Sequence, residues 1–580
     1  MAQVHRVQQQ GTAIQDSANH APIKILITDR IAHEGLDLLH AQLPEAQIDE
    51  KIGIAPEVLR EIIPDYVALI VRSETRVTKE ILEAGKNLKI VGRAGVGVDN
   101  IDTEAATRQG IIVVNSPTGN IIAAAEHSIA LLMALARHIP AANSSTRAGK
   151  WEKSRFVGVE VRNRTLGVIG LGKVGSEVAK RAIGLEMQVI AFDPYVSPEH
   201  ARKLGVTTMP LDEVLQKSDF VTLHTSLTSG PNGTRGLIGA RELALMKPGA
   251  RIINCARGGL IEEEALLEAL NSKHIAGAAL DVFTQEPIRD SEVLKQLLAH
   301  EQVIATPHLG ASTEEAQVGV ATDVAEQIAT VVRGGFPRAS VNAPILLPET
   351  LKVLQPYIHL VEQMGRLYTQ LQPGPLTKVE LACSGEIANY DLRPLQAALI
   401  KGLLESVSDA HVNLINAPVL AKQWGLEIIE QKSTTSTEFA NMVTLRVETT
   451  DGYASSFAGK PGSGDEQVER LSGTVMHGEP RIVRVGRYWT EFVPEGYILF
   501  CRNLDQPGMI GHVGTVLGKA GVNIRHMDVG PIVRSPHKHG VQTPPDTALM
   551  VISVDDPISD AAIQEIGAAG EIFGVTLVTL

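Results

Sequence analysis

The sequence has 580 residues, which is too long for a single hydrophobic core, so we expect three or four domains. It contains 53 Lys and Arg residues against 66 Asp and Glu residues, which gives a formal net charge of −13. This balance argues against a general nucleic-acid-binding protein, because such proteins carry a basic face.

The cysteines and the apolar stretches indicate the cellular compartment and whether the chain contains a membrane-spanning segment. Cys255, Cys383 and Cys501 are far apart and show no disulfide or zinc-binding pattern, which favours a reducing compartment, and we expect a cytoplasmic location. The longest apolar stretch, Ile121–Ala136, is interrupted by polar residues and is expected to be a buried helix. Residues 1–22 form a polar tail without the apolar segment of a secretory signal, but their composition does not decide whether they are an organelle transit peptide.

The first folded domain is predicted to contain a parallel sheet. Its strands are expected at four apolar segments that alternate with helical patterns: Lys24–Asp29, Tyr66–Val71, Leu88–Val91 and Ile111–Asn115. The loops after these strands carry candidate substrate-binding residues, which are Arg72, Ser73, Arg76 and Arg93. Arginines on neighbouring loops suit a phosphate or a carboxylate, although solvated surface arginines would give the same pattern.

The segment from Arg164 to Pro194 has the order strand, glycine turn, helix, strand and acidic residue, which is typical of dinucleotide binding. Gly170 would allow the tight turn, Gly172 would let a pyrophosphate approach the backbone, and Gly175 would let the helix pack against the strand. Asp193 lies at about the separation expected for the acid that binds the adenosine ribose. Because Asp193 would repel a 2′-phosphate, the sequence favours NAD over NADP.

Six apolar segments around this turn are predicted to form one doubly wound parallel sheet: Leu166–Ile169, Gln188–Phe192, Phe220–His224, Ala250–Asn254, Gly277–Asp281 and Val303–Thr306. Ligands bind such sheets at the carboxyl ends of the strands. The residues found there are Asp193, Thr225, Cys255, Ala256, Arg257, Asp281, Glu286 and His308. We therefore expect them to gather at one crevice.

Three residues of this group can carry the chemistry of hydride transfer to or from a 2-hydroxy acid. Arg257 has a permanently charged, forked guanidinium that can hold a carboxylate. His308 can exchange a proton with the substrate oxygen near neutral pH, and Glu286 can orient the imidazole. Taken singly, a structural histidine and a glutamate in a turn would be ordinary alternatives.

The motifs GLGKVG…FDP, NCARGG, DVFTQEP and PHLGAST resemble those of the D-isomer-specific 2-hydroxyacid dehydrogenases. The resemblance is dense from about residue 24 to 342 and continues more loosely to the end of the chain. It implies that Arg257, Glu286 and His308 are catalytic and that Arg72, Ser73, Arg76, Arg93 and Arg257 bind substrate. It implies NAD contacts from Gly170, Gly172, Lys173, Val174, Gly175, Asp193, Thr225, Cys255, Ala256, Arg257, Asp281, His308 and Gly310.

The family resemblance also implies the order of domains in this α/β chain. A Rossmann-type NAD domain at 119–308 would be inserted into a flavodoxin-like substrate domain at 23–118 and 309–342. An α+β intervening domain at 343–494 and a ferredoxin-like ACT domain at 495–580 would follow. The segment around Trp151 resembles an arm that reaches a partner subunit, so we expect a homodimer or homotetramer.

The C-terminal part shows no catalytic cluster in its sequence. Expected elements include strands at Lys378–Leu381 and Met442–Val447, a helix at Pro394–Ser406, and loops at Gly459–Gly478 and Arg534–Pro545. The segment from Tyr497 has a βαββαβ pattern with D-Q-P-G and G-V-N-I motifs, which resembles an ACT regulatory domain. Asn503, Asp505 and Asn523 match positions that bind an amino-acid effector, such as L-serine, in relatives.

The motifs VRSETRVT, GRAGVGVDNID and HTSL resemble those family members that oxidise 3-phosphoglycerate to 3-phosphohydroxypyruvate with NAD, the first step of L-serine biosynthesis. This is the activity that we expect. A reductase of another 2-keto acid, such as 2-oxoglutarate or hydroxypyruvate, and a non-catalytic dinucleotide sensor are the alternatives. No metal and no membrane partner is expected.

Overall fold

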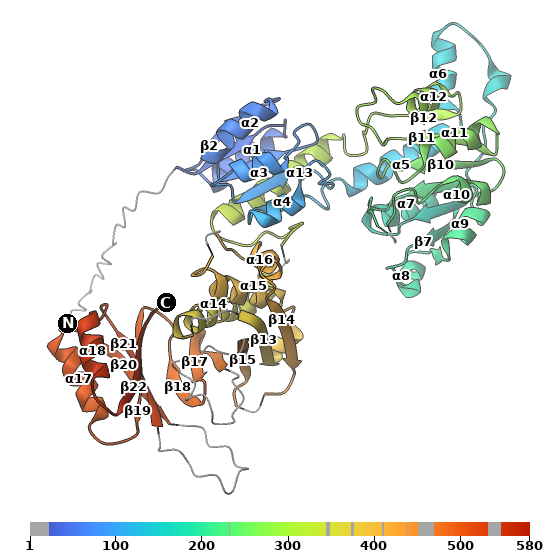
Figure 1. Cartoon of the computed structure of the whole chain (residues 1–580). Coiled ribbons are helices and arrows are strands. Elements are labelled where there is room, and N and C mark those ends of the chain that lie inside the picture. The colour runs from blue at the N-terminus through green and yellow to red at the C-terminus, as the bar shows by residue number, and fades with distance from the viewer. Residues whose placement is uncertain are drawn as a thin grey trace, which may run out of the picture.

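The computed structural model describes residues 22–230, 233–343, 348–372, 376–408, 411–436, 438–449, 469–531 and 547–580. They form four β-sheets with helices packed against them. Figure 1 shows two lobes formed by the N-terminal half of the chain, coloured blue and cyan to green, and a C-terminal half, yellow to red, that follows the blue lobe. Residue 22 is the only described residue of the tail at 1–22, and the loop at 534–545 lies wholly outside the described residues.

The first lobe contains a five-stranded parallel sheet in the order β2-β1-β3-β4-β5. Apolar clusters cover both faces of this sheet, as expected for a buried parallel sheet. The polar strand β2 was not predicted, because it lies at the sheet edge and lacks an apolar run. The strands are β1 (Lys24–Ile27), β2 (Gln47–Glu50), β3 (Ala68–Val71), β4 (Ile90–Arg93) and β5 (Ile112–Asn115).

Helices complete the first lobe on both sides of its sheet. One of them, α13, comes from much later in the sequence and packs against α1 and β4. The chain thus leaves this lobe after β5 and returns to it through α13. The helices are α1 (His33–Gln42), α2 (Pro56–Ile62), α3 (Lys79–Ala84), α4 (Thr103–Arg108) and α13 (Glu314–Val332).

The second lobe contains a seven-stranded parallel sheet in the order β12-β11-β10-β9-β6-β7-β8. The six predicted strands are all present, and the additional strand β8 has only two residues, too few for a sequence pattern. The strands are β6 (Thr165–Ile169), β7 (Gln188–Phe192), β8 (Thr207–Thr208), β9 (Phe220–Leu223), β10 (Ala250–Asn254), β11 (Ile275–Leu280) and β12 (Val303–Ala305). The order reverses beside β6, and this switch point is where such sheets bind ligands.

The helices of the second lobe include the apolar stretch singled out in the sequence. It forms α5, whose inner face is buried, as expected. Across the described residues, no single helix is long and apolar enough to cross a membrane, and only α5 and α6, bent by 63°, pass that test as a pair. The helices are α5 (Ile121–Ala136), α6 (Ile139–Arg147), α7 (Lys173–Gly184), α8 (Pro198–Lys203), α9 (Leu211–Lys217), α10 (Ala240–Leu245), α11 (Glu263–Asn271) and α12 (Glu292–Ala299).

The third unit has a six-stranded mixed sheet in the order β14-β13-β15-β16-β17-β18, with helices on one face. The predicted loop at Gly459–Gly478 is wrong for its last part, because residues 469–476 form β16, in which Leu471 and Ser472 are buried. Residues 459–468 lie outside the described part. The elements are α14 (Pro348–Leu371), β13 (Leu376–Gly385), α15 (Arg393–Leu404), α16 (Ala417–Gln423), β14 (Glu427–Ser433), β15 (Asn441–Thr449), β16 (Glu469–Met476), β17 (Glu479–Val485) and β18 (Tyr488–Phe492).

The fourth unit has the predicted βαββαβ order and a four-stranded antiparallel sheet arranged β20-β21-β19-β22. One face of this sheet packs on its own two helices. The other face adds Phe500, Leu549 and Val578 to the apolar core of the third unit, so the two sheets share one core. The elements are β19 (Tyr497–Leu504), α17 (Met509–Lys519), β20 (Ile524–Pro531), β21 (Thr547–Val554), α18 (Asp560–Gly567) and β22 (Ile572–Thr579).

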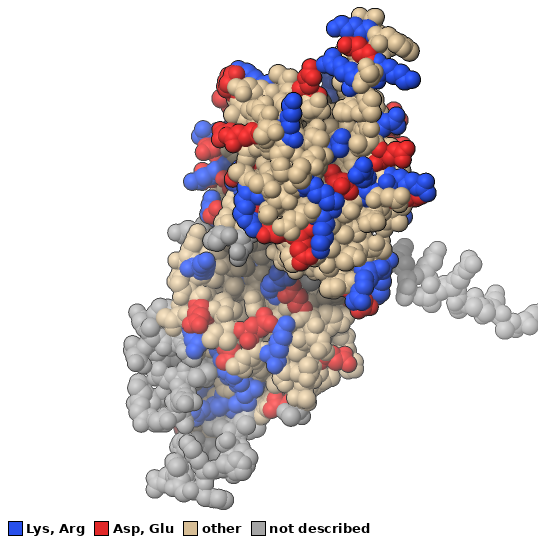
Figure 2. Space-filling view, turned by 90° about the vertical axis from the view of Figure 1, so that its right-hand side faces the viewer, with Lys and Arg blue, Asp and Glu red and all other residues tan. Residues whose placement is uncertain are grey.

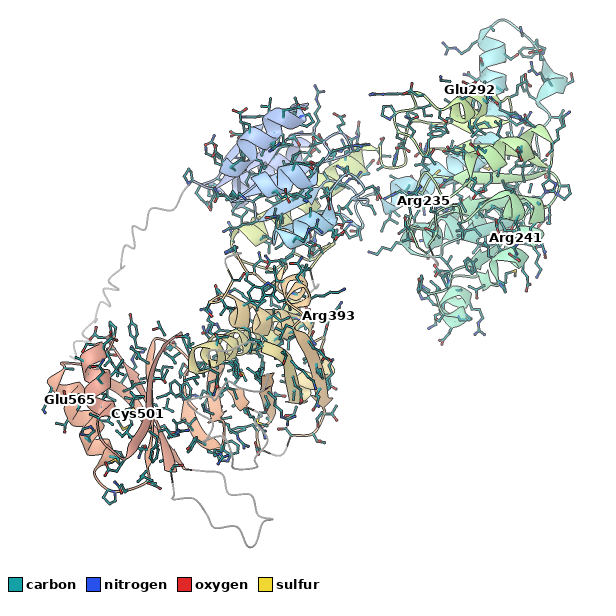
Figure 3. All side chains as sticks on the ribbon, in the orientation of Figure 1. Arg235, Arg241, Glu292, Arg393, Cys501 and Glu565 are labelled. Carbon is teal, nitrogen blue, oxygen red and sulfur yellow. The ribbon has the colours of Figure 1, made fainter. Side chains whose placement is uncertain are left out.

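Charged side chains of both signs and three free cysteines are found among the described residues. Figure 2 shows basic and acidic side chains mixed over the visible face. All three cysteines are free. Cys501 lies on β19 within the fourth sheet (Figure 3), and burial raises the pKa of its thiol to about 12.

Candidate active site

The glycine turn between β6 and α7 has the geometry of a phosphate-binding loop. Gly170 has a φ of +93°, and a Cβ atom there would lie 2.8 Å from the carbonyl oxygen of His224. A Cβ atom at Gly175 would overlap the carbonyl oxygen of Gly170, so only glycine lets α7 start this close to β6. A Cβ atom at Gly172 would meet no protein atom within 4 Å. The space in front of the helix N-terminus is therefore open to an anion.

Asp193 closes this turn from the end of β7. Its carboxylate accepts hydrogen bonds from the backbone N–H groups of Leu171 and Tyr195, both at 2.8 Å. The carboxylate is therefore fixed beside the glycine turn. Lys173 and Val174 are the first residues of α7 and flank the same turn. This is the position at which an acid meets the ribose of a dinucleotide.

Two further strand ends carry polar groups suited to a cofactor. The hydroxyl of Thr225, after β9, is buried and has no hydrogen-bond partner. An orphaned buried hydroxyl is costly, so a ligand group is its natural partner. Cys255 follows β10, and burial raises the pKa of its thiol to about 12, which keeps it neutral. Ala256 donates its N–H to the side chain of Asn254 at 3.0 Å, which holds this turn in place.

Asp281, at the end of β11, anchors the segment that carries His308. Its fully buried carboxylate accepts hydrogen bonds from the N–H groups of Leu309 at 2.7 Å and Gly310 at 2.8 Å. Burial raises the pKa of this carboxyl, but hydrogen bonds from His127, Thr306 and the backbone outweigh burial and lower the pKa overall. Asp281 is therefore an ionised, fully engaged carboxylate.

His308 and Glu286, which follow β12 and β11, are hydrogen-bonded to each other. His308 Nδ1 lies 2.7 Å from Glu286 Oε2, while Glu286 Oε1 accepts the N–H of Phe283 at 2.9 Å. Burial raises the pKa of Glu286, yet the bonds from His308 and Phe283 lower it overall. The carboxylate thus fixes the orientation of the imidazole ring through Nδ1.

Arg257 lies where the two lobes meet. Its Nη1 donates to the carbonyl of Ala256 at 2.7 Å, and its Nε lies 3.3 Å from Asp99 Oδ2 on the first lobe. A Cβ atom at Gly97 would overlap the guanidinium, so the first lobe approaches Arg257 through a residue without a side chain. Arg257 can therefore face a substrate held between the lobes.

The arginines of the first lobe add positive charge beside Arg257. Burial lowers the pKa of Arg93 to about 10, and the charges of Arg257 and Arg72 contribute to this shift. The Nε atom of Arg93 is buried without a partner. Asp99 and Asp29 offset part of this positive charge, and a cluster of arginines of this kind suits an anionic ligand. Ser73 and Arg76 are exposed on the same loop as Arg72, and no contact among the described residues joins them to the cluster.

Sequence reasoning missed the residues that hold the arginine-bearing loop. The buried Asp29 accepts N–H groups of Arg72 at 2.6 Å, Glu74 at 3.2 Å and Thr75 at 3.1 Å. Asn100 Nδ2 donates to the carbonyls of Arg72 and Thr75, both at 2.7 Å. Asp29 comes at the end of the predicted first strand, and this position was the available signal.

The three candidate effector residues lie at different places in the fourth unit. Asn503 is buried, its Nδ2 donates to the carbonyl of Leu504 at 2.6 Å, and its Oδ1 has no partner. Asn523 Nδ2 donates to Asp555 at 2.6 Å, and Asp505 is exposed in the turn before α17. Within the described part of the chain, these three side chains form no hydrogen bond or ion pair with one another.

Comparison with known proteins defines the class first. Residues 129–310 match the family model described as "D-isomer specific 2-hydroxyacid dehydrogenase, NAD binding domain". The fold resembles the TT0316 protein from Thermus thermophilus (32% identity, TM-score 0.50, 55% of this chain and 100% of that one). It also resembles a glyoxylate reductase from Paecilomyes thermophila (30% identity, TM-score 0.50, 56% and 98%). The chain is thus an NAD-dependent enzyme of the 2-hydroxyacid dehydrogenase class.

The C-terminal matches and the relatives narrow this class. Residues 353–486 match the D-3-phosphoglycerate dehydrogenase intervening domain and residues 497–571 match the ACT domain. The D-3-phosphoglycerate dehydrogenase of Synechocystis is 45% identical over 94% of this chain and 92% of its own. Those of Archaeoglobus fulgidus and Bacillus subtilis are 40% and 37% identical over 96% of this chain and 100% and 99% of their own. The chain belongs to the D-3-phosphoglycerate dehydrogenase family.

Proposed function

We propose that this protein oxidises 3-phosphoglycerate to 3-phosphohydroxypyruvate with NAD, the first step of L-serine biosynthesis. The observation that carries the proposal is the His308–Glu286 pair, with Nδ1 and Oε2 2.7 Å apart, which follows strands β12 and β11, beside the strand before Arg257, whose charge acts on Arg93. A proton acceptor and paired anion-binding groups are what a phosphorylated 2-hydroxy acid requires.

Each residue of the site has a separate role in the proposed reaction. Arg257 holds the substrate carboxylate, and Arg72, Ser73, Arg76 and Arg93 supply the positive and polar groups for the substrate on the first lobe. NAD, when bound, would supply the hydride acceptor for C2 of the substrate.

The proton leaves by a separate route. His308 Nε2 removes the proton of the C2 hydroxyl, and Glu286 stabilises the imidazolium that forms. The alcohol thus loses one hydride and one proton and becomes a ketone. Proton transfer of this kind typically contributes roughly 10²–10⁴-fold to the rate.

The cofactor would be held by the parts of the second lobe that fit it. The open glycine turn at Gly172 would take the pyrophosphate, and Asp193 would meet the ribose. The orphaned hydroxyl of Thr225 would find its partner on the cofactor side of the crevice.

The test is the absorbance change at the nicotinamide band with NAD and 3-phosphoglycerate, compared with D-glycerate at equal concentration. D-Glycerate is the matched control, because it lacks only the phosphate. We expect oxidation of 3-phosphoglycerate to exceed that of D-glycerate by at least tenfold in kcat/KM. Equal rates with both, or faster reduction of 2-oxoglutarate or hydroxypyruvate that survives replacement of Arg72 and Arg76, would contradict the proposal.

We also propose that the enzyme works as a homodimer or homotetramer in the cytoplasm. The side chains of Trp151 and Val157, just after α6, are 87% and 77% exposed, which suits a surface covered by a second subunit. Light scattering of wild type and Trp151→Ser tests this: the variant should shift toward the monomer, and a wild-type monomer would refute it.

An amino-acid effector such as L-serine is proposed for the ACT domain, with Asn503, Asp505 and Asn523 as candidate contacts. The unpartnered Oδ1 of the buried Asn503 supports a ligand at this place. A serine titration of activity and melting temperature is the test. No change in either quantity would exclude serine.

A further inference from the structure

His127 takes no part in the proton transfer proposed above. It lies on α5, and its side chain is 20% exposed. Its Nε2 atom is 3.2 Å from Asp281 Oδ1 and 3.2 Å from Thr306 Oγ1. The imidazole therefore contacts the residue that anchors the His308 segment, and it comes from a different element.

The His308 segment needs such an anchor, because its backbone is strained. His308 has a φ of +56°, in the left-handed region that is unfavourable for a residue other than glycine. The N–H of His308 donates to the Asp281 carbonyl at 2.9 Å, and the N–H groups of Leu309 and Gly310 donate to the Asp281 carboxylate. Asp281 thus holds three consecutive backbone N–H groups.

The proton positions in this network follow from its partners. The Thr306 hydroxyl donates to Asp281 Oδ1 at 2.5 Å, so its oxygen remains free to accept. The ionised Asp281 can only accept. Both neighbours of His127 Nε2 are therefore acceptors, and Nε2 must carry the proton. His127 is one of four donors that compensate the buried carboxylate.

We propose that His127 is a positioning residue of the dehydrogenase reaction. Its Nε2–H fixes the Asp281 carboxylate, Asp281 fixes the backbone at 308–310, and this backbone aims the His308 ring at the substrate hydroxyl. This inference rests on the proposed function. It adds a residue whose contacts, within the described residues, are to Asp281 and Thr306 and not to His308 or the arginine cluster.

The test compares three substitutions that differ in where they place a donor. Glutamine can reach the Nε2 position with an amide N–H, asparagine carries the same amide one methylene short of it, and leucine has no donor. We expect His127→Gln to keep kcat within about threefold of wild type, whereas His127→Asn and His127→Leu lose about tenfold or more. The KM for 3-phosphoglycerate should stay within about twofold in all three, because the arginine cluster is intact.

The pattern among the variants decides the question. Equal kcat in the glutamine, asparagine and leucine variants would overturn the proposal, and so would an asparagine variant more active than the glutamine variant. His200→Leu on α8 is the matched control, because His200 is exposed and should leave kcat unchanged.

A double-mutant cycle keeps the proposal testable if the single variants are destabilised. If His127 acts through Asp281, His127→Leu should cost much less in an Asp281→Asn background than in wild type. An equal cost in both backgrounds would refute the inference. Wild-type turnover of 3-phosphoglycerate, measured in parallel, separates this outcome from a failure of the proposed function. If that substrate is not oxidised, the same series can be measured on the reduction of hydroxypyruvate.

Discussion

Arg257 and Asp99 form an ion pair across the crevice, with Nε and Oδ2 3.3 Å apart. The Asp99 side chain is 69% exposed, so this pair is screened by solvent and contributes little to stability. If Arg257 binds the substrate carboxylate as proposed, that carboxylate can replace Asp99 at small cost.

Replacement of Arg257 should therefore be far more damaging than replacement of its partner. We expect Arg257→Lys to lower kcat/KM for 3-phosphoglycerate by roughly 100-fold, since an ammonium cannot hold a carboxylate at two points. Asp99→Asn should change kcat/KM by less than about fivefold. Steady-state kinetics of both variants provide the measurement. A larger loss with Asp99→Asn would assign Asp99 a direct part in substrate binding.

His308→Ala should lower kcat by at least about 100-fold, because it removes the only proton acceptor that the proposed mechanism uses. NADH should still bind, since the glycine turn and Asp193 are untouched. The measurement pairs turnover with nicotinamide fluorescence on titration. Turnover near the wild-type rate would mean that another group takes the proton.

Gly175 and Gly184 lie on the same helix and make a matched pair. Gly175→Ala should abolish NAD binding, because the added Cβ overlaps the carbonyl oxygen of Gly170 and forces α7 away from β6. Gly184→Ala meets no atom within 4 Å and should bind NAD normally, with stability equal to or about 0.5–1 kcal/mol above wild type. Titration calorimetry and thermal unfolding distinguish the two, and equal NAD affinity would contradict this account of the turn.

Asp29 should affect the substrate and not the cofactor. Asp29→Ala removes the acceptor for three N–H groups of the loop that carries Arg72. We expect the KM for 3-phosphoglycerate to rise by about tenfold or more, and Asn100→Ala to act in the same direction. The KM for NAD serves as the internal control. A parallel rise in both KM values would indicate general unfolding instead.

The lowered pKa of Asp281 predicts a pH dependence of stability. Because its folded pKa lies below the ordinary value of 3.8, the stabilisation is present above that pH and is lost as pH falls through the folded pKa. Asp281→Asn should therefore be less stable than wild type at pH 7, and the difference should shrink below about pH 4. Urea unfolding at both pH values checks this. A difference that does not change with pH would mean that charge plays no part.

Much of the fold was visible in the sequence, and the exceptions share a cause. Apolar runs located the strands of both parallel sheets, because strands buried on both faces are continuously apolar. The edge strand β2 and the two-residue β8 lack such runs, and β16 lies in a segment whose glycines and charges predicted a loop. These segments are extended because they pair with neighbouring strands. A local sequence pattern carries no information about that pairing.

Some residues of the candidate site could likewise be predicted from the sequence, and others could not. Residues at strand ends, such as Thr225 and Asp281, could be placed at one crevice because parallel strands end at one edge. Asp29, Asn100 and His127 could not be assigned, because they act by bonding to backbone or side chains that are distant in sequence. The electrostatic interaction between Arg93 and Arg257 also could not be predicted, because it depends on how the two lobes pack together.

The common core of the third and fourth sheets bears on how a signal could leave the ACT domain. Moving that domain by itself would expose Phe500, Leu549 and Val578 to water, at roughly 1.5–3 kcal/mol for each buried apolar side chain. The two units are therefore expected to move together as one rigid body. Its contact with the first lobe includes Asn413, which donates to the Gly110 carbonyl at 2.7 Å, just before the strand that leads to the crevice.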